Sequence, residues 1–236
     1  MTPGFNTSSS TTENCSTCED RSCAASALLE TELAFLHGSC LESSFIKGDV
    51  IIHQGSVSSQ IVYVRSGLVL EYIRGENGKN QIIQIVKSRS YLGLPSLFSD
   101  HINHYSYKAL EDLKVCYIGI EPFNELIRKN GKFAYELLVS VCQDSLNSHH
   151  RFLNINVKQT FGKVADALQY FSRIIFESNA FDLSLTRSEI GALVNVSRES
   201  TSRAMNKFQN DGIIMVTGNH YEILKPDVLE QISRNG

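Results

Sequence analysis

Three cysteines lie close together near the start of the chain. Cys15, Cys18 and Cys23 occupy a stretch of nine residues in the segment NCSTCEDRSC. Their neighbours are small, polar or charged, so packing in a core does not explain them. One short loop can deliver several thiolate ligands at little extra ordering cost, which suits a metal. The spacing therefore predicts a metal site.

The number and spacing of the cysteines narrow the kind of metal. Zinc sites usually combine two pairs of ligands, and this chain has no second close cysteine pair. Three close thiolates with a fourth from elsewhere match the way iron–sulfur clusters are held. The other cysteines of the chain are Cys40, Cys116 and Cys142. A zinc site, a thiol-based redox switch and a mobile tail with thiols of no function are the alternatives.

A second segment, LTRSEIGALVNVSRESTSRAMNKFQNDG over residues 185–212, has the pattern of a helix-turn-helix. Thr186 and Glu189 have the spacing of a capping box, which begins a helix. Asn195 tolerates the left-handed conformation that a tight turn needs, and Ser197 is a favourable N-cap for a second helix. The residues expected to be buried, or to allow the close helix contact, are Ile190, Gly191, Leu193, Val194, Ala204, Met205 and Phe208.

The outward face of the second helix carries side chains that can read DNA. Arginine can donate two hydrogen bonds to guanine, glutamate can accept one from the cytosine amino group, and serine can bond a base or a phosphate. The N-terminal part of a recognition helix meets base edges in the major groove. The residues assigned to this contact are Arg198, Glu199, Ser202 and Arg203, all in the first two turns.

The charge of this segment supports the same assignment. Between residues 184 and 208, four basic side chains stand against two acidic ones, in a chain whose net charge is −3. We also assign the start of the first helix to the DNA contact, with Arg187 near phosphate and Thr186 and Ser188 beside it. The alternative is a surface helix with ordinary solvated charges.

The rest of the pattern describes the elements that must position these two segments. Residues 26–38 predict a short helix, and residues 44–120 show short apolar runs between glycine turns, which predict a barrel or sandwich of about 75 residues. Residues 121–158 predict a long helix that joins two domains and packs against a partner chain, with a plain linker as the alternative. Residues 159–236 predict a second small domain that ends in a hairpin.

Composition sets the limits of these interpretations. With 42% hydrophobic and 20% charged residues, the chain can bury a core, and a net charge of −3 excludes a uniformly basic protein. Residues 1–14 are rich in Ser and Thr, and we expect a disordered tail without the features of a signal peptide. We therefore expect a cytoplasmic protein, in which thiols serve metal or redox chemistry more often than structural disulfides.

This layout resembles the family of the cyclic-AMP receptor protein and the fumarate–nitrate-reductase regulator (CRP/FNR) over about residues 15–230. The similarity runs through Ile46-Lys47-Gly48-Asp49, Gly55 and Tyr63-Val64-Arg65-Ser66-Gly67, and through EIGALVNVSREST in the second domain. The resemblance implies an α+β chain with a jelly-roll-like β-roll of the cyclic-nucleotide-binding type, a long dimerisation helix and a winged helix. Such a protein acts as a homodimer on an inverted repeat in double-stranded DNA, with RNA polymerase as a further partner. The domains would be residues 1–26 for the tail and cysteine loop, 27–121 for the β-roll, 122–158 for the dimerisation helix and 159–236 for the winged helix.

The β-roll separates two branches of the family. The cyclic-AMP branch holds its ligand with a Gly-Glu segment and an Arg-Ser pair. Here Tyr91 occupies the glutamate position, and no arginine occurs from Ser90 to Ile127. Lys108 could supply a charge but not a bidentate grip on phosphate. We therefore expect no cyclic nucleotide ligand.

The FNR branch implies a 4Fe–4S cluster held by Cys15, Cys18, Cys23 and Cys116. The best-known members have five residues between the second and third cysteines, whereas this chain has four. Cys40 and Cys142 have no counterpart in the resemblance. We expect both to be small buried side chains, with Cys40 as the reserve ligand.

The resemblance implies an oxygen- or redox-sensing regulator in which the cluster controls dimerisation and binding to a TTGAT-type inverted repeat. The alternative is a family member without iron that responds to thiol redox state or to a small-molecule effector. An iron–sulfur electron carrier or oxidoreductase is the rival from another class. Against an enzyme, the sequence has no glycine-rich nucleotide loop and no second cysteine cluster.

Overall fold

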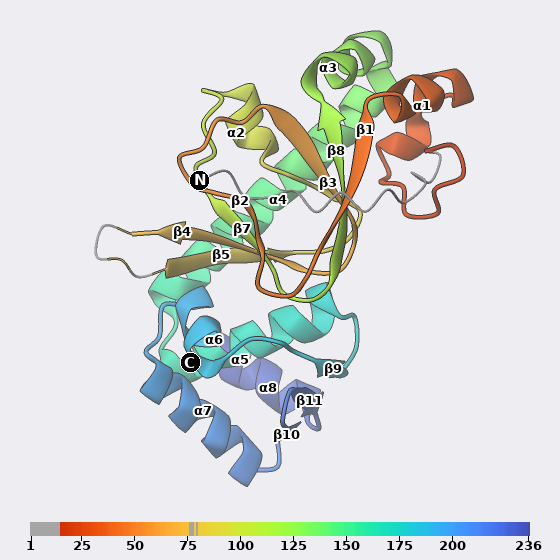
Figure 1. Cartoon of the computed structure of the whole chain (residues 1–236). Helices are drawn as coiled ribbons and strands as arrows, with labels where there is room; N and C mark the ends of the chain where they lie inside the picture. The colour runs from red at the N-terminus through yellow and green to blue at the C-terminus, as the bar shows by residue number, and fades with distance from the viewer. Residues whose placement is uncertain (1–14, 76–77, 79) are drawn as a thin grey trace. The chain divides into compact units, whose positions relative to one another are not determined.

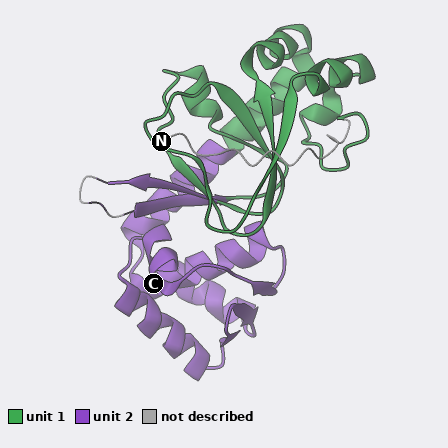
Figure 2. Ribbon diagram, in the orientation of Figure 1, with its two compact units in different colours: residues 1–69, 86–143 green, residues 70–85, 144–236 purple. Residues whose placement is uncertain are grey.

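The computed structural model describes residues 15–75, 78 and 80–236, so the tail predicted for residues 1–14 lies outside the described part. The chain forms two compact units, which Figure 2 distinguishes by colour. The first contains residues up to 69 together with 86–143, and the second contains residues 70–85 and 144–236. Among the described residues, no helix has both the length and the apolar character that crossing a bilayer requires.

Short strands build the first unit, as the glycine-bounded apolar runs predicted (Figure 1). Its strands are β1 (Cys40–Phe45), β2 (Val50–Ile52), β3 (Gln60–Ser66), β6 (Ser90–Leu92), β7 (Ser106–Ala109) and β8 (Leu113–Gly119). One antiparallel sheet has the order β1-β8-β3-β6, and β2 pairs with β7. The barrel-like β-domain predicted for residues 44–120 is confirmed.

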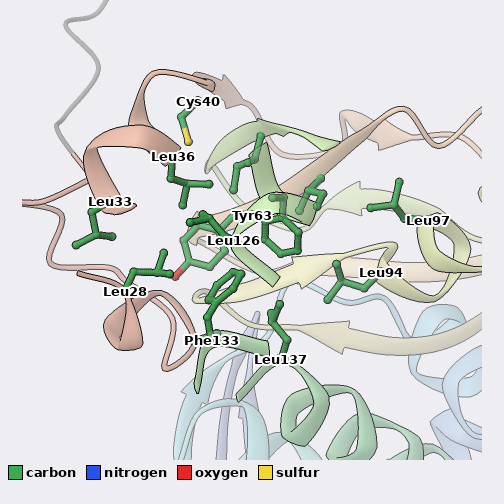
Figure 3. Close-up of a cluster of buried hydrophobic side chains, with 14 residues drawn as sticks. Leu28, Leu33, Leu36, Cys40, Tyr63, Leu94, Leu97, Leu126, Phe133 and Leu137 are labelled. Carbon is green, nitrogen blue, oxygen red and sulfur yellow. The ribbon is translucent and has the colours of Figure 1, made fainter. Parts of the chain in front are cut away.

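Both faces of the β1-β8-β3-β6 sheet are covered. Val62, Val64 and Val115 point into one core, and the alternate residues Tyr63 and Cys116 point into the other. The second core is covered by helices η1 (Ala25–Ala27), α1 (Glu30–His37), α2 (Leu94–Phe98), α3 (Ile120–Lys129) and the start of α4 (Gly131–Val157). Figure 3 shows Cys40 and Tyr63 among the leucines of this core. The cysteine-bearing face is therefore an interior face.

The helical region predicted as one segment over residues 121–158 is two helices. The break falls at Asn130, whose Oδ1 accepts hydrogen bonds from the backbone N–H groups of Lys132 and Phe133 at 3.1 and 3.0 Å. Asn130 thus caps the start of α4, because an asparagine side chain can satisfy N–H groups that a helix start leaves open. α4 then continues for 27 residues.

The second unit combines a winged helix with a hairpin from the β-domain part of the sequence. Its elements are β4 (Val69–Arg74), β5 (Asn80–Val86), α5 (Thr160–Tyr170), η2 (Phe171–Ile175), β9 (Ala180–Asp182), α6 (Arg187–Leu193), α7 (Arg198–Asn210), β10 (Ile214–Thr217), β11 (His220–Ile223) and α8 (Pro226–Asn235). The sheet order is β10-β11-β9. The predicted hairpin is confirmed, and β9 adds a third strand to it.

The β4–β5 hairpin is held to the rest of the second unit by hydrogen bonds. The Tyr170 hydroxyl bonds both the N–H and the carbonyl of Ile85, at 3.2 and 3.1 Å. The Gln81 side-chain amide donates to the carbonyl of Ala192 in α6 at 2.5 Å. The predicted fold class, a β-roll followed by a long helix and a winged helix, is confirmed.

Candidate DNA interface and cysteine site

The first helix of the helix-turn-helix, α6, begins with the predicted capping box. Thr186 Oγ1 accepts a hydrogen bond from the Glu189 backbone N–H at 3.2 Å, and Glu189 Oε2 accepts one from the Thr186 backbone N–H at 2.9 Å. Two N–H groups that the helix start would leave open are satisfied in this way. Ile190 and Leu193 of the same helix are buried. Local sequence alone therefore sets the start and the inner face of α6.

The turn between the two helices depends on Gly191 and Asn195. Asn195 has φ of 53°, the left-handed conformation that was predicted for it. A Cβ atom added at Gly191 would lie 2.8 Å from the Thr201 hydroxyl of α7 and closer still to the Val196 carbonyl oxygen. Helix α7 therefore packs directly against the backbone of α6, as the glycine predicted.

The second helix, α7, presents the predicted polar face. Ser197 caps it by accepting a hydrogen bond from the Ser200 backbone N–H at 3.2 Å. The inward side chains of α7, all buried, are Thr201, Ala204, Met205 and Phe208. Of the four residues assigned to base contacts, Arg198, Glu199 and Arg203 are exposed and Ser202 is half-buried. The exposed groups come from adjoining turns of one helix face.

The local electrostatics keep this face ready for hydrogen bonding. A backbone N–H at its own position and the Ser197 hydroxyl lower the pKa of Glu199, which therefore stays an acceptor at neutral pH. Arg203 Nη2 donates to the Ser200 hydroxyl at 3.0 Å. That bond leaves further N–H groups of the same guanidinium for another acceptor.

Arg187, assigned to phosphate, has a further contact inside the domain. Its guanidinium lies 5.6 Å from the centre of the Tyr221 ring, on strand β11. One guanidinium nitrogen, Nη1, is buried without a hydrogen-bond partner among the described residues. Thr186 and Ser188 beside it are exposed. The structure therefore shows Arg187 packing on the wing, and its contact with phosphate stays a prediction.

Four side chains form a row across the β1-β8-β3-β6 sheet. The register pairs Glu42 with Cys116, Cys116 with Tyr63, and Tyr63 with Tyr91. Because opposite residues of paired strands share a face, all four side chains lie on the interior face. The rings of Tyr63 and Tyr91 are 4.9 Å apart. The cysteine loop packs on this row of side chains.

Polar contacts attach the loop of residues 15–23 to this row of side chains. The Tyr63 hydroxyl donates to the carbonyl of Asp20, and the Ser22 and Tyr91 hydroxyls are 3.0 Å apart. Burial raises the pKa of Tyr63, so its hydroxyl stays protonated and can donate. Arg65, 6% exposed, bonds Glu42 at 2.9 Å and lies 3.8 Å from the Asp20 carboxylate. The loop is thus positioned by strands distant in sequence.

Four of the six cysteines meet at this place; we call Cys15, Cys18, Cys40 and Cys116 the thiol cluster. Cys18 and Cys40 are each 8% exposed, whereas Cys15 and Cys116 are half-buried. The Sγ atoms of Cys15 and Cys40 are 3.9 Å apart. Cys15 and Cys116 pack against the core that contains Cys40, and Cys18 is near enough to act electrostatically on Cys40 and Cys116. Cys23 lies on the same loop and is exposed, so we leave it out of this group.

The environment separates the thiols by proton affinity. The hydrogen bond shared with Cys40, assisted by His37, lowers the pKa of Cys15 to about 6. The same hydrogen bond, together with burial, raises the pKa of Cys40. Burial raises the pKa of Cys116 to about 12, although the nearby Arg65 acts in the opposite direction. Of Cys15, Cys40 and Cys116, Cys15 is therefore the thiol with the lowest pKa.

The structure also corrects and extends the sequence-based assignment. Cys40 is buried as predicted, but the same prediction for Cys142 was wrong: Cys142 is exposed, on a part of α4 beyond the buried Leu137. Sequence reasoning did not assign Arg65 or Asp20 to the cysteine site. The signal available for Arg65 was a charged residue inside the apolar run IVYVRSG, because buried arginines are rarely unpaired.

Comparisons with known proteins agree with both halves of this architecture. A cyclic nucleotide-binding domain model matches residues 42–130, and a Crp-like helix-turn-helix domain model matches residues 162–232. The chain belongs to the CRP/FNR family of transcription regulators. It is therefore a DNA-binding regulator and not an enzyme.

Individual CRP/FNR regulators show how far the similarity extends. The transcriptional activator protein Anr of Pseudomonas protegens is 26% identical over 184 residues, 76% of this chain and 75% of Anr. The fumarate and nitrate reduction regulatory protein of Escherichia coli K12 is 26% identical over 192 residues, 79% of this chain and 76% of that protein. The structure of FixK2 from Bradyrhizobium japonicum superposes with a TM-score of 0.75 at 19% identity, covering 82% of this chain and 96% of FixK2.

The thiols of this CRP/FNR regulator suit an iron–sulfur cluster in ligand type and partly in position. Thiolate is the ligand that such clusters use. Cys15 and Cys116 pack against one core and Cys18 lies on the same loop as Cys15, but Cys23 is exposed. Within residues 15–75, 78 and 80–236, no group of three or more His, Cys, Asp or Glu side chains is arranged to hold a metal ion. The ligand set read from the sequence stays a prediction.

Proposed function

We propose that this regulator senses oxygen or a related oxidant through a 4Fe–4S cluster bound by Cys15, Cys18, Cys23 and Cys116. Such a cluster, when bound, supplies an iron–sulfur group that reacts with oxygen. The observation that carries the proposal is that Cys15 of the loop and Cys116 of β8 pack against one core of the β-domain, although about a hundred residues of chain separate them. Cys23 belongs to the same loop and is the fourth ligand in the proposal.

The position of Cys116 supports a link from the cysteine loop to dimerisation. Strand β8 ends at Gly119 and α3 begins at the next residue, with α4 starting at Gly131. Ile118 of β8 packs in one core with Phe123 of α3 and Phe133 of α4. A change in how the loop lies on β8 would therefore be felt where α4 begins, because packed cores transmit displacement.

The exposed face of α4 supports a homodimer. Large apolar side chains remain uncovered along most of its length, which is costly in water and typical of a surface that binds another chain. These residues are Tyr135, Leu138, Val139, Val141, Leu146, Phe152, Leu153 and Val157. Packing of α4 against its copy in a second subunit would bury them and place two α7 helices on the two halves of an inverted repeat.

For the DNA sequence we propose a TTGAT-type half-site. Glu199 and Arg203 would read the TGA core that this half-site shares with TGTGA, with Ser202 beside them. Arg198 can contact an additional guanine, so the preferred half-site lies between TTGA and TGTGA. Bound in this way, the dimer would act on transcription through contacts with RNA polymerase.

A cyclic nucleotide is not part of the proposal. Its phosphate needs a bidentate arginine, and the segment from Ser90 to Ile127 has none. Tyr91, at the position of the family's glutamate, is occupied by its contacts with Ser22 and Tyr63. Calorimetry with cyclic AMP should show no binding at micromolar concentrations.

The colour of the protein tests the cluster. Protein purified without oxygen should be brown, with about four irons per chain. Replacing Cys15, Cys18, Cys23 or Cys116 by serine should remove the colour, whereas the matched control Cys142→Ser should keep it. A colourless wild-type protein from strictly anaerobic preparation would refute the iron–sulfur proposal.

A regulator without iron that responds to thiol redox state or to a small-molecule effector is the second candidate. The contact between Cys15 and Cys40 favours a thiol response, because two thiols at 3.9 Å need no metal to react with each other. One measurement separates the two candidates. If the thiol response is correct, DNA binding by the iron-free protein changes with a thiol oxidant and not with iron.

A further inference from the structure

One member of the thiol cluster, Cys40, has no part in the proposed iron–sulfur site. It is the first residue of β1 and pairs with Ile118 of β8. Since Ile118 and Cys116 are two residues apart on one strand, Cys40 and Cys116 lie diagonally on the same face. The Sγ atom of Cys40 is 3.9 Å from the Sγ atom of Cys15. Two thiols at this distance can react with each other to form a disulfide.

We infer that Cys15 and Cys40 form a disulfide when the iron-free chain meets a thiol oxidant, and that this pair is a redox modification site of the protein. The inference does not depend on the proposed cluster, because it concerns the thiols alone. It does bear on the cluster, since Cys15 would be common to both.

The geometry selects this pair from the six cysteines. A disulfide bond is about 2.05 Å long, so the two sulfur atoms must approach by a little under 2 Å. Cys40 is fixed by strand pairing, whereas Cys15 lies on a turn, so the approach requires movement of the turn only. Among the described residues, no other two cysteine thiols are within hydrogen-bond distance of each other. Cys23 and Cys142 are exposed.

The chemistry is thiol–disulfide exchange with a low-molecular-weight disulfide. The Cys15 thiolate attacks one sulfur of the reagent, forms a mixed disulfide and releases one small thiol. The Cys40 sulfur then attacks Cys15 Sγ, and the second small thiol leaves with the proton of Cys40. The two cysteines lose two electrons, and the reagent disulfide is reduced to two thiols. The net change is one protein S–S bond formed and one reagent S–S bond broken.

If the proposed function also holds, the disulfide competes with it. Formation of the Cys15–Cys40 bond removes one of the four predicted ligands, so the oxidised chain would not take up iron until a reductant restores the thiol. The competition would give the regulator an iron-free state that is chemically distinct from the reduced one.

The test is to map the disulfide in full-length, iron-free protein. The chain is prepared with a chelator and a reductant, oxidised with glutathione disulfide, blocked with an alkylating reagent and cut after glutamate. Cleavage separates Cys23 from Cys40, giving fragments 14–19 with Cys15 and Cys18, 20–30 with Cys23, and 33–42 with Cys40. We expect fragment 14–19 to be linked to fragment 33–42.

Two variants make the assignment unambiguous. In Cys18→Ser, fragment 14–19 contains Cys15 as its one cysteine, so a link to fragment 33–42 identifies the pair directly. In Cys15→Ser the same link should be absent, and Cys142→Ser should behave as wild type. Circular dichroism of each variant confirms that the chain is folded.

The result that overturns the inference is equally specific. A folded Cys18→Ser protein that forms no link, or that links fragment 14–19 to fragment 20–30 or to the Cys116 fragment, would refute it. The colour of the anaerobic protein is a separate measurement. A brown protein without the disulfide refutes the inference alone, and a colourless protein with the disulfide refutes the cluster alone.

Discussion

The helix-turn-helix and the cysteine site are built in opposite ways. In the helix-turn-helix, the capping box, the turn and the second cap join residues no more than a few positions apart, from Thr186 to Ser200. In the cysteine site, the loop of residues 15–23 is held by Tyr63 and Arg65 of β3 and by Tyr91 of β6. One region is specified by neighbours in the chain and the other by neighbours in space.

This difference explains where sequence-based assignment succeeded. The predicted roles of Gly191, Asn195 and Ser197 are all confirmed, because caps and turns follow local rules. At the cysteine site, the spacing of Cys15, Cys18 and Cys23 identified the loop but not which thiols meet. Cys40 joins the group through strand pairing and Cys23 does not. Disturbing each region separately therefore tests the comparison.

The largest effect is expected at the cysteine site from Arg65→Ala. The side chains of Arg65 and Glu42 are 7% and 11% exposed, so the substitution leaves a buried carboxylate without its partner. Breaking a buried pair in this way costs about 3–5 kcal/mol of unfolding free energy. Urea denaturation measures the loss, and faster alkylation of Cys18 should report that the loop has come away from the sheet.

The matched control is the double variant Arg65→Met with Glu42→Leu. It removes both charges and should recover most of the lost stability, because no buried charge remains unpaired. If Arg65→Ala alone denatures like the wild type, the ion pair does not support the site.

A smaller effect is expected in the helix-turn-helix from Gly191→Ala. The added methyl would overlap the Val196 carbonyl and the Thr201 hydroxyl, so α6 and α7 must separate slightly. Overpacking of this kind costs about 1–3 kcal/mol, which calorimetry of the variant measures. Gly131→Ala is the control, because nothing lies within 4 Å of a Cβ at that position. Equal stability of the two variants would show that the helices do not depend on close contact.

The third effect concerns DNA affinity. Arg203→Ala should cost about 1–3 kcal/mol of binding free energy and relax specificity at one base pair. Arg187→Ala should weaken binding to all sequences alike and reduce the salt dependence. Fluorescence anisotropy with single-base-pair variants of the site separates the two patterns. Selection from random DNA that enriches no inverted repeat containing TGA would contradict the assigned recognition face.

Much of the architecture could be predicted from the sequence, because it rests on periodicity and on local signals. Glycine-bounded apolar runs predicted the β-domain, and the apolar run of β3 is buried on both faces, where successive residues face different cores. Two features were missed. The single helix predicted for residues 121–158 is divided at Asn130, and β9 joins the wing through three residues that lack a strong strand pattern.

The sequence by itself determined the caps and the turn of the regulator's helix-turn-helix, because each is completed by residues within reach along the chain. It also determined that three thiols lie on one loop. Only the tertiary structure decided which thiols meet, because strand register places Cys40 and Cys116 diagonally on one face and the packing of the loop on that face brings Cys15 to Cys40. Register depends on pairing between distant segments, and a shift of one residue would turn Cys116 to the opposite face of the sheet.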